Sequence, residues 1–268
     1  MQIIKKVIRY PFNLMGLQII NINGYNAQQQ RISEIILTAN KFYKETLQNS
    51  RDNLSDPEYL QFLELKYGGL VQNVSRNNVS PHDPRSKRQL QEGGMQGGDR
   101  MNVFFHNYSE KYSQYLEPLR HSKKTIHLLE VGILKGTGLA VWDWYFDNKR
   151  IYGFDYDLGN FEQNKNNLLE LGAFKNELPT LKFFDQFADN SKTLDETFGS
   201  QKIDVVIDDA YHSDETIINT FNELQPYLSN NFVYFIEDNR SAWKKLQIKY
   251  PQYNFDYNDN ELTVVTKK

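Results

Sequence analysis

Acidic residues follow two apolar segments of this sequence, at the point where each segment ends. Asp208 and Asp209 end the run I-D-V-V-I-D-D, and Glu237 and Asp238 end the later run N-F-V-Y-F-I-E-D. If both runs are strands of an open α/β sheet, their carboxyl ends lie at the rim where ligands bind. Converging carboxylates repel one another unless a cation or protons share the site, and Mg²⁺ prefers oxygen ligands. The pattern predicts a divalent-metal site.

His212 lies three residues beyond Asp209, where an imidazole could act as a general base beside the metal. The alternatives are a surface histidine that begins the following helix and a hydrogen-bonded histidine of the core. Asp208 also keeps alternatives: it could cap the following helix, or it could bind the metal in place of Asp209. Adjacent residues of a strand face opposite ways, so only one of the two acids faces the metal.

Strands must position these acids, and the sequence after residue 125 contains short apolar segments that alternate with helical patterns. The expected strands are His127–Ile133, Ile151–Phe154, Leu181–Phe184, Ile203–Ile207 and Phe232–Ile236. The expected helices are Leu139–Phe146, Asn164–Leu171, Ser191–Phe198 and Glu215–Leu228. Continuously apolar strands that alternate with helices predict a parallel sheet covered on both faces. Two further β-like segments, Asn254–Tyr257 and Leu262–Thr266, predict a C-terminal antiparallel hairpin. The fold class is therefore α/β, a doubly wound Rossmann-like sheet with a hairpin, typical of class I methyltransferases.

The part of the chain before this sheet has a different composition. Residues 26–66 show apolar residues at helical spacing, and residues 67–99 are rich in turn formers and contain two Gly-Gly pairs. We expect residues 1–98 to form a mostly helical region and loop, serving as an oligomer, substrate or lid segment. Residues 99–268 form the sheet domain.

A glycine-rich turn follows the first predicted strand. The segment L-L-E-V-G-I-L-K-G contains Glu130, Gly132 and Gly136, and glycine permits both a sharp reversal and a close approach to a ligand. The spacing is not the G-x-G-x-x-G of dinucleotide-binding proteins. An acid at the first position suits a positively charged group, such as the amino group of S-adenosylmethionine, better than a pyrophosphate.

Polar residues also end the next two predicted strands. Asp155 ends the second strand, 25 residues after Glu130, which is close to the offset of the acid that binds ribose in doubly wound folds. Asp185 and Gln186 end the third strand and could bind the edge of an adenine. The alternative is that such residues only cap helices. Because four successive strands end this way, we favour a cofactor pocket and count Asp208 among its residues.

Composition excludes several classes of protein. The formal net charge is −3, which gives no reason to expect a nucleic-acid partner, and the absence of cysteine excludes disulfides and thiolate metal sites. No apolar run approaches the roughly 20 residues of a membrane span. The N-terminus has no unbroken apolar core of a signal peptide, so we expect a cytoplasmic protein. Its amphipathic start favours an oligomer contact, and hence a homo-oligomer, over a membrane anchor.

With these residues in place, the chain resembles the metal-dependent O-methyltransferases that act on macrolide sugars (the mycinamicin type) and the related methyltransferase-like proteins of cephalosporin biosynthesis. The resemblance covers roughly residues 97 to 240, judged by the order of the motifs. The motifs are G-D-R at 98–100, L-E-V-G-I-L-K-G at 129–136, W-D-W-Y-F at 142–146, G-F-D at 153–155, D-Q-F-A-D at 185–189, I-D-D-A-Y-H at 207–212 and I-E-D at 236–238.

The resemblance implies S-adenosylmethionine as cofactor, Asp209, Glu237 and Asp238 as ligands of a magnesium ion, and His212 as the general base. The family usually has Gly-Ser where this chain has Ala210 and Tyr211, which leaves the shape of the pocket open. Asp99 and Arg100 could reach the carboxylate of the cofactor or close the site.

The expected activity is therefore methyl transfer from S-adenosylmethionine to a hydroxyl of a sugar, a glycan or a glycosylated small molecule. The alternatives are a metal-dependent hydrolase or oxygenase-like enzyme on the same fold, and an inactive methyltransferase-like subunit of an assembly.

Overall fold

The structure is a computed structural model that describes residues 54–103 and 105–268. The chain divides into two compact units, residues 1–51 and 52–268, and the described residues belong to the second. The helices predicted before residue 54 and the amphipathic N-terminus lie outside the described residues.

A seven-stranded sheet forms the centre of this second unit, in the order β5-β4-β3-β6-β7-β9-β8. Its strands are β3 (Ile126–Val131), β4 (Lys149–Asp155), β5 (Thr180–Phe183), β6 (Ile203–Asp208), β7 (Leu228–Ile236), β8 (Tyr253–Tyr257) and β9 (Thr263–Lys267). Neighbouring strands from β5 to β7 are parallel, and β9 is antiparallel to both β7 and β8. The predicted doubly wound sheet with a C-terminal antiparallel hairpin is confirmed.

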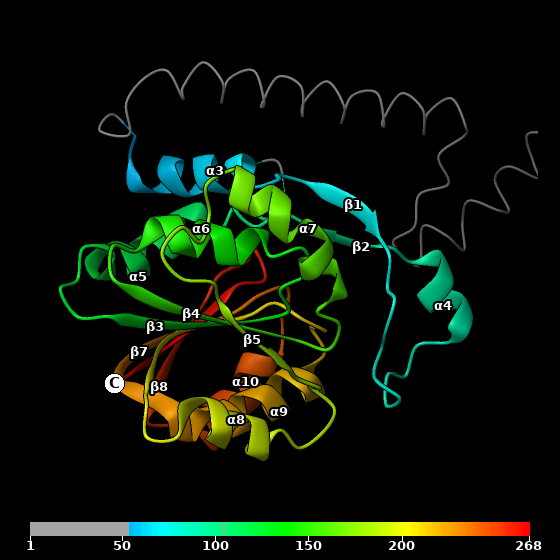
Figure 1. Cartoon of the computed structure of the whole chain (residues 1–268). Helices are drawn as coiled ribbons and strands as arrows, with labels where there is room; N and C mark the ends of the chain where they lie inside the picture. The colour runs from blue at the N-terminus through cyan, green and yellow to red at the C-terminus, as the bar shows by residue number, and fades with distance from the viewer. Residues whose placement is uncertain (1–53, 104) are drawn as a thin grey trace, which may run out of the picture. The chain divides into compact units, whose positions relative to one another are not determined.

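Helices cover both faces of the sheet, as Figure 1 shows. One face carries α3 (Asp56–Lys66), α5 (Ser109–Arg120), α6 (Thr137–Tyr145) and α7 (Gly159–Glu170). The other carries α8 (Ser191–Phe198), α9 (Asp214–Leu224) and α10 (Ala242–Lys249), and the short 3-10 helix η2 (Gln225–Tyr227) follows α9. Residues along a strand face alternate layers: Leu128 packs in the first layer and Leu129 in the second. This two-sided burial explains why β3 and β6 are apolar almost throughout.

Residues 67–99 contain more regular structure than the predicted loop. They form β1 (Val71–Val74), α4 (Lys87–Glu92) and β2 (Met95–Gly97), with β1 and β2 paired antiparallel. Both strands are too short for a hydrophobic period, and their partners lie far apart in the sequence. A capping box of Ser86 and Gln89 begins α4. The predicted loop therefore contains three short regular elements.

Helix α3 belongs to the core of the sheet unit. Tyr59, Leu60 and Leu63 are buried in the same cluster as residues of α5 and α6. The compact unit therefore begins before residue 98, where the change in composition placed the predicted boundary. Among the described residues, no helix is long and apolar enough to cross a membrane.

Candidate active site

The strands β3, β6 and β7 end at the same level of the sheet. Val131 is in register with Asp208, and Asp208 is in register with Ile236. The residues that follow continue this alignment, since Asp209 N–H donates to the carbonyl of Val131 and Glu237 N–H donates to that of Asp208. The acids of β6 and β7 therefore meet at one edge, as the sequence predicted.

The glycine-rich turn after β3 lies directly against the acidic loop after β6. Gly132 has a φ of 90°, and a Cβ there would lie 2.2 Å from the carbonyl oxygen of Asp209. Gly136, with a φ of 76°, begins α6, and a Cβ there would lie 2.3 Å from the ring of Phe161. Both positions require glycine, and Gly132 brings the predicted cofactor loop and the predicted metal site into contact.

A cavity of about 440 Å³ opens at this edge of the sheet. This volume lies in the range of roughly 300–1,000 Å³ that small-molecule sites occupy. The predicted site residues that line it are Glu130, Gly132, Asp155, Asp185, Gln186, Asp209, His212 and Asp238. Gly136, Asp208 and Glu237 do not line it. Most of the residues that the sequence singled out therefore face one pocket.

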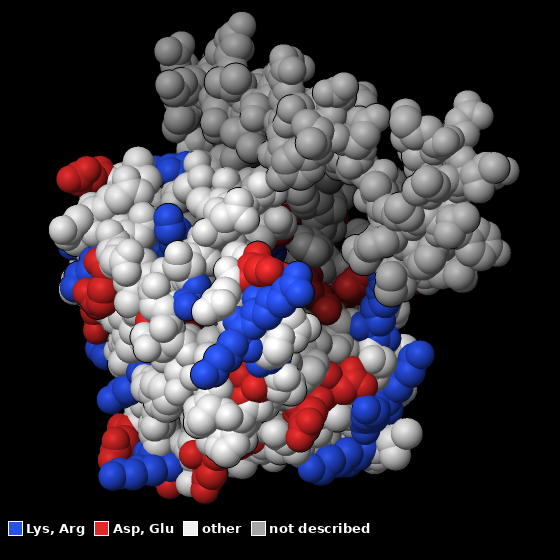
Figure 2. Space-filling model, turned by 90° about the vertical axis from the view of Figure 1, so that its right-hand side faces the viewer, with Lys and Arg blue, Asp and Glu red and all other residues white. Residues whose placement is uncertain are grey.

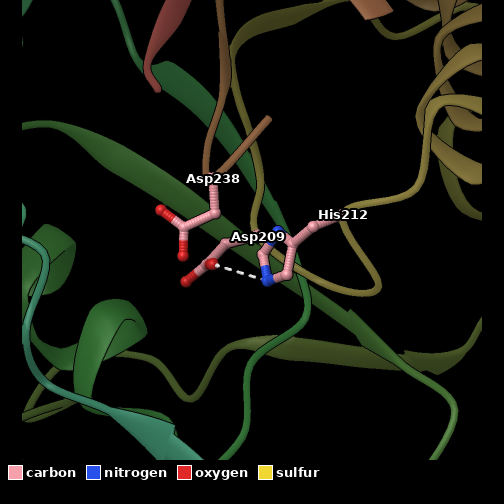
Figure 3. Close-up of side chains that lie close together, drawn as sticks. All are labelled: Asp209, His212 and Asp238. Atoms are coloured by element: carbon pink, nitrogen blue, oxygen red, sulfur yellow. Dashed lines mark ion pairs between the residues drawn. The ribbon is translucent and has the colours of Figure 1, made fainter. Parts of the chain in front are cut away.

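Asp209, His212 and Asp238 converge in the cavity, as Figure 3 shows. One potential ligand atom from each lies within 4.8 Å of the others, and in residues 54–103 and 105–268 this is the group of acids and histidine that could hold a metal ion. The Nε2 atom of His212 lies 3.7 Å from Oδ1 of Asp209. The arrangement distinguishes the two acids at the end of β6: Asp209 lines the cavity and Asp208 does not.

The loop after β6 holds His212 in an unusual backbone conformation. His212 has a φ of 61°, in the left-handed region that histidine adopts more readily than most residues. Its carbonyl oxygen accepts a hydrogen bond from the Asn239 side chain, and Ser213 caps α9 through its hydroxyl. Its Nδ1 lies 3.3 Å from the carbonyl oxygen of Glu237. These contacts from β7 and α9 direct Nε2 toward Asp209.

Glu237 lies beneath the cavity rather than in the group around His212. Its carboxylate is buried, forms an ion pair of 2.6 Å with Nε of Arg100, and accepts a hydrogen bond from the hydroxyl of Tyr112. Burial raises the pKa of Glu237 to about 8, although Arg100 opposes the shift. The role of Glu237 as a metal ligand stays a prediction.

Arg100 is the central cation of the site. Its side chain is 9% exposed, and its Nη2 atom lies 2.9 Å from Glu130 and 2.7 Å from Asp209, in addition to the pair with Glu237. Glu130 also accepts a hydrogen bond from the indole of Trp142, and burial raises its pKa. The acid that we predicted to bind the cofactor is thus already paired with a buried guanidinium.

His106 is a site residue that the sequence did not single out, because its aromatic-rich surroundings favoured core packing. It lines the cavity with its ring between two acids: Nε2 lies 3.5 Å from Asp99 and Nδ1 lies 3.3 Å from Asp238. The hydrogen bond to Asp99 and the charge of Asp238 raise the pKa of His106 to about 9, against its desolvation. Tyr108 donates a further hydrogen bond of 2.8 Å to Asp238. Both partners hold the Asp238 carboxylate in place.

Asp155 joins the end of β4 to the glycine-rich turn. Its carboxylate accepts hydrogen bonds from the backbone N–H groups of Ile133, Leu134 and Asp157. Burial raises the pKa of Asp155, and these hydrogen bonds oppose the shift. Asp155 therefore shapes the turn and also lines the cavity.

The polar residues after β5 and β6 are linked to one another. Gln186 donates to the buried carboxylate of Asp208, which also accepts from the hydroxyl of Tyr234, and burial raises the pKa of Asp208 to about 7. Asp185 accepts a hydrogen bond of 2.8 Å from the hydroxyl of Ser80, in the segment before α4. The buried carboxylate of Asp208 thus holds the Gln186 side chain in place. Ser80, which contacts Asp185, lies before residue 99, where the predicted sheet domain begins.

Tyr211, the departure from the family pattern, lines the same cavity. Its ring lies 4.9 Å from that of Phe187, and the guanidinium of Arg85 lies 4.6 Å from its centre. Arg85 is itself paired with Asp83. The bulky side chain therefore forms a fixed aromatic wall of the cavity, close to His212.

A parallel sheet that ends in an antiparallel hairpin, with a glycine-rich turn beside acids at the carboxyl edge, is the architecture of the class I methyltransferases that use S-adenosylmethionine. A curated relative from Streptomyces olivaceus, 8-demethyl-8-alpha-L-rhamnosyl tetracenomycin-C 2'-O-methyltransferase, is 24% identical over 176 residues, which cover 63% of this chain and 40% of that protein. The chain thus spans less than half the length of this relative.

Solved structures are also similar to part of this chain. The MycE methyltransferase from the mycinamycin biosynthetic pathway, in complex with Mg and SAH, is 18% identical with a TM-score of 0.49, covering 61% of this chain and 50% of that one. A putative caffeoyl-CoA O-methyltransferase from Staphylococcus aureus is 16% identical with a TM-score of 0.43, covering 59% of this chain and 82% of that one. No protein-family model matches the sequence.

Proposed function

We propose that this protein is an S-adenosylmethionine-dependent O-methyltransferase that uses a divalent cation and acts on a hydroxyl of a sugar or a glycosylated small molecule. The observation that carries the proposal is the single cavity in which the turn at Gly132 contacts the loop of Asp209 and His212. Methyl transfer needs its donor and its acceptor side by side, and this contact supplies that proximity.

The residues around Asp209 fit a divalent cation. Asp209 and Asp238 offer two carboxylates beside the imidazole of His212. Glu237, the third predicted ligand, pairs with Arg100 in the same site, and burial raises its pKa to about 8. Acids whose pKa burial raises are stabilised in their charged form by a nearby positive charge. A cation bound by these residues would lower the pKa of an acceptor hydroxyl at the same site.

The other half of the cavity fits the cofactor. Gly132 lets a ligand approach the backbone, and Asp155 and Asp185 place carboxylates along the cavity wall. S-adenosylmethionine supplies an electrophilic methyl group when bound. Asp155 would orient its ribose, and Asp185, held by Ser80, would orient its adenine.

His212 would remove the proton from the acceptor hydroxyl. Its Nδ1 faces the carbonyl oxygen of Glu237, which can only accept a hydrogen bond, so the neutral imidazole carries its proton on Nδ1. Nε2 is then free to take the proton. The resulting imidazolium would lie 3.7 Å from the carboxylate of Asp209, which stabilises the positive charge.

The acceptor class rests on two supports. The curated relative is named as a methyltransferase of a rhamnosyl group, and the solved mycinamycin methyltransferase has also been seen with Mycinamycin VI. In addition, the face shown in Figure 2 carries Lys and Arg side chains with Asp and Glu side chains beside them. Mixed charge of this kind favours an uncharged or small polar acceptor over a nucleic-acid backbone.

Calorimetry and methyl transfer to a panel of glycosides test the proposal. The protein should bind S-adenosylhomocysteine, and transfer of labelled methyl groups should require a divalent cation and stop in excess chelator. Asp209→Asn should abolish transfer. Asp204→Asn is a matched control, because Asp204 lies near the opposite end of β6 and pairs with Lys124. Absence of S-adenosylhomocysteine binding, or full transfer in chelator, would contradict the proposal.

A further inference from the structure

One buried guanidinium connects the two halves of the cavity. Arg100 lies between β2 and α5, and its side chain, 9% exposed, contacts carboxylates from three different strands. Glu130 belongs to β3, on the side of the glycine-rich turn, whereas Asp209 follows β6 and Glu237 follows β7. Nη2 is shared between Glu130 and Asp209, at 2.9 and 2.7 Å. The guanidinium of Arg100 therefore contacts acids on both the cofactor side and the metal side of the cavity.

The backbone around Arg100 is held firmly enough to keep the guanidinium there. The carbonyl oxygen of Arg100 accepts a hydrogen bond from the N–H of Tyr108, and the N–H of Met101 lies 3.1 Å from both carboxylate oxygens of Glu64. The guanidinium also lies 5.7 Å from the ring of Trp142. A change in its charge environment would thus alter what it binds more than where it lies.

The charges around Arg100 make the binding of the divalent cation and the binding of the cofactor depend on one another. A divalent cation that uses the carboxylate of Asp209 competes with Arg100 for it, because both draw on the same negative charge. Arg100 would then be left with less compensating charge, facing a cavity that it lines together with Glu130 and Gly132. A buried guanidinium that has lost a carboxylate partner binds another carboxylate strongly.

We infer that Arg100 couples the two sites, so that binding of a divalent cation at Asp209 strengthens binding of the amino-acid carboxylate of the cofactor. The inference rests on the proposed function, since it assumes a cofactor with such a carboxylate in the cavity. Linkage makes the effect reciprocal: the cofactor strengthens the binding of the cation by the same factor. Couplings of this kind are typically about 5-fold to 150-fold.

Two ligands distinguish coupling through the amino-acid carboxylate from a general effect of the divalent cation on nucleoside binding. S-adenosylhomocysteine carries the carboxylate and has no sulfonium charge to repel a cation, whereas 5'-methylthioadenosine has the same adenosine without the amino-acid part. In calorimetry on the wild-type full chain, saturating Mg²⁺ should strengthen S-adenosylhomocysteine binding at least about fivefold, at the lower end of typical couplings. It should leave methylthioadenosine binding unchanged. Competition with Mn²⁺, followed by electron paramagnetic resonance, should show the reciprocal gain.

Variants locate the coupling at Arg100. Arg100→Gln should remove the Mg²⁺ effect on S-adenosylhomocysteine, and Arg100→Lys should weaken it, since an ammonium cannot reproduce the fork that holds two carboxylates. Arg120→Gln is the matched control, because Arg120 is a cation with a 12% exposed side chain paired with Asp56, outside the residues that line the cavity. It should keep the wild-type coupling.

The outcomes distinguish the two proposals. If neither nucleoside ligand binds the wild-type protein, the proposed function fails. If S-adenosylhomocysteine binds equally well with and without Mg²⁺, or if methylthioadenosine gains as much as S-adenosylhomocysteine, the coupling through Arg100 is refuted while the proposed function stands. The wild-type comparison of the two ligands decides the question even if Arg100→Gln does not fold.

Discussion

Replacement of His212 tests the proposed proton transfer most directly. Loss of a positioned general base slows a reaction by about 100-fold to 10,000-fold. At about 1.4 kcal/mol for each factor of ten, this corresponds to roughly 3 to 5 kcal/mol of transition-state stabilisation. His212→Ala and His212→Asn should both show a reduction of this size in the chemical step. The asparagine variant is included because asparagine tolerates the left-handed backbone of His212.

The fold should survive both replacements. The side chain of His212 is 31% exposed, and its described hydrogen-bonding contact is the one of 3.3 Å with the carbonyl oxygen of Glu237. A single such hydrogen bond contributes about 0.5–1.5 kcal/mol. For a unit of this size, about 2–4 °C of melting temperature corresponds to 1 kcal/mol, so the loss should be no more than roughly 6 °C. Affinity for S-adenosylhomocysteine should also be kept, because His212 lies on the acceptor side.

Single-turnover methyl transfer, measured across a pH series, is the appropriate assay. The wild-type rate should fall at acidic pH, because a protonated His212 cannot accept a proton, and both variants should lose this dependence. His106→Ala is the matched comparison: its side chain is also 31% exposed in the same cavity. The hydrogen bond to Asp99 and the charge of Asp238 raise the pKa of His106 to about 9, which favours its protonated form at neutral pH over a role as base. This variant should keep the acidic decline. Near-normal turnover of His212→Asn with an unchanged acidic decline would refute the role of His212.

Three further predictions concern other parts of the site and the fold. Gly132→Ala should weaken metal and cofactor binding together and lower the melting temperature, because its Cβ would lie 2.2 Å from the carbonyl of Asp209 at a φ of 90°; calorimetry and thermal unfolding measure both effects. Asp155→Ala should weaken S-adenosylhomocysteine binding and unfold at a lower temperature than Asp155→Asn, because the asparagine keeps one oxygen for the three backbone N–H groups that bind the carboxylate. Burial raises the pKa of Asp256, but the hydrogen bonds from Lys111 and Tyr115 and the charge of Lys111 outweigh burial and leave that pKa lowered. The charged Asp256 carboxylate therefore stabilises the fold above its unfolded pKa, and this stabilisation is lost as pH falls through the folded pKa. Asp256→Asn should accordingly be less stable than wild type at pH 7, and chemical unfolding in acid should show the difference shrink as pH falls below about 4.

The sheet and its acidic edge could be predicted because each depends on local sequence. Strands buried on both faces are apolar throughout, and the chain marks their ends with acids or glycine at Gly132, Asp155 and Asp209. The order of the strands then places these ends together. By contrast, β1 and β2 are short segments whose pairing joins Val71 to Gly97, a contact that no local pattern indicates.

The orientation of the acid pairs could not be taken from residue types alone. Alternation along β7 sends Phe235 into the layer of α5 and α6 and Ile236 into the opposite layer. Glu237 therefore turns to the same side as Phe235, where Tyr112 and Arg100 surround it. In sequence, Glu237 and Asp238 are equivalent neighbours, and the register of the strand distinguishes the buried Glu237 from the half-buried Asp238.

The burial and the three ion pairs of Arg100 could not be predicted from the sequence, which indicated only that Arg100 could reach the carboxylate of the cofactor or close the site. Arg100 lies in a short connection, with no periodicity around it, and its partners Glu130, Asp209 and Glu237 lie 30 to 137 positions further along the chain. Its proximity to them depends on the packing of α5 against the sheet. An arginine in a loop is most often solvated, and only the fold shows that this one is buried.

The presence of Arg100 explains how the chain can fold with so many acids at one edge. Buried carboxylates without a counter-ion would cost several kcal/mol each. Arg100 and the protonated His106 supply positive charge from the protein itself, next to Glu237 and Asp238 respectively. A divalent cation bound at Asp209, as proposed, would compete with these internal charges. This competition would limit the affinity for the cation and make that affinity depend on what else approaches Arg100. Arg100 thus compensates the acids at this edge and, in the proposed coupling, makes the binding of the divalent cation depend on the binding of the cofactor.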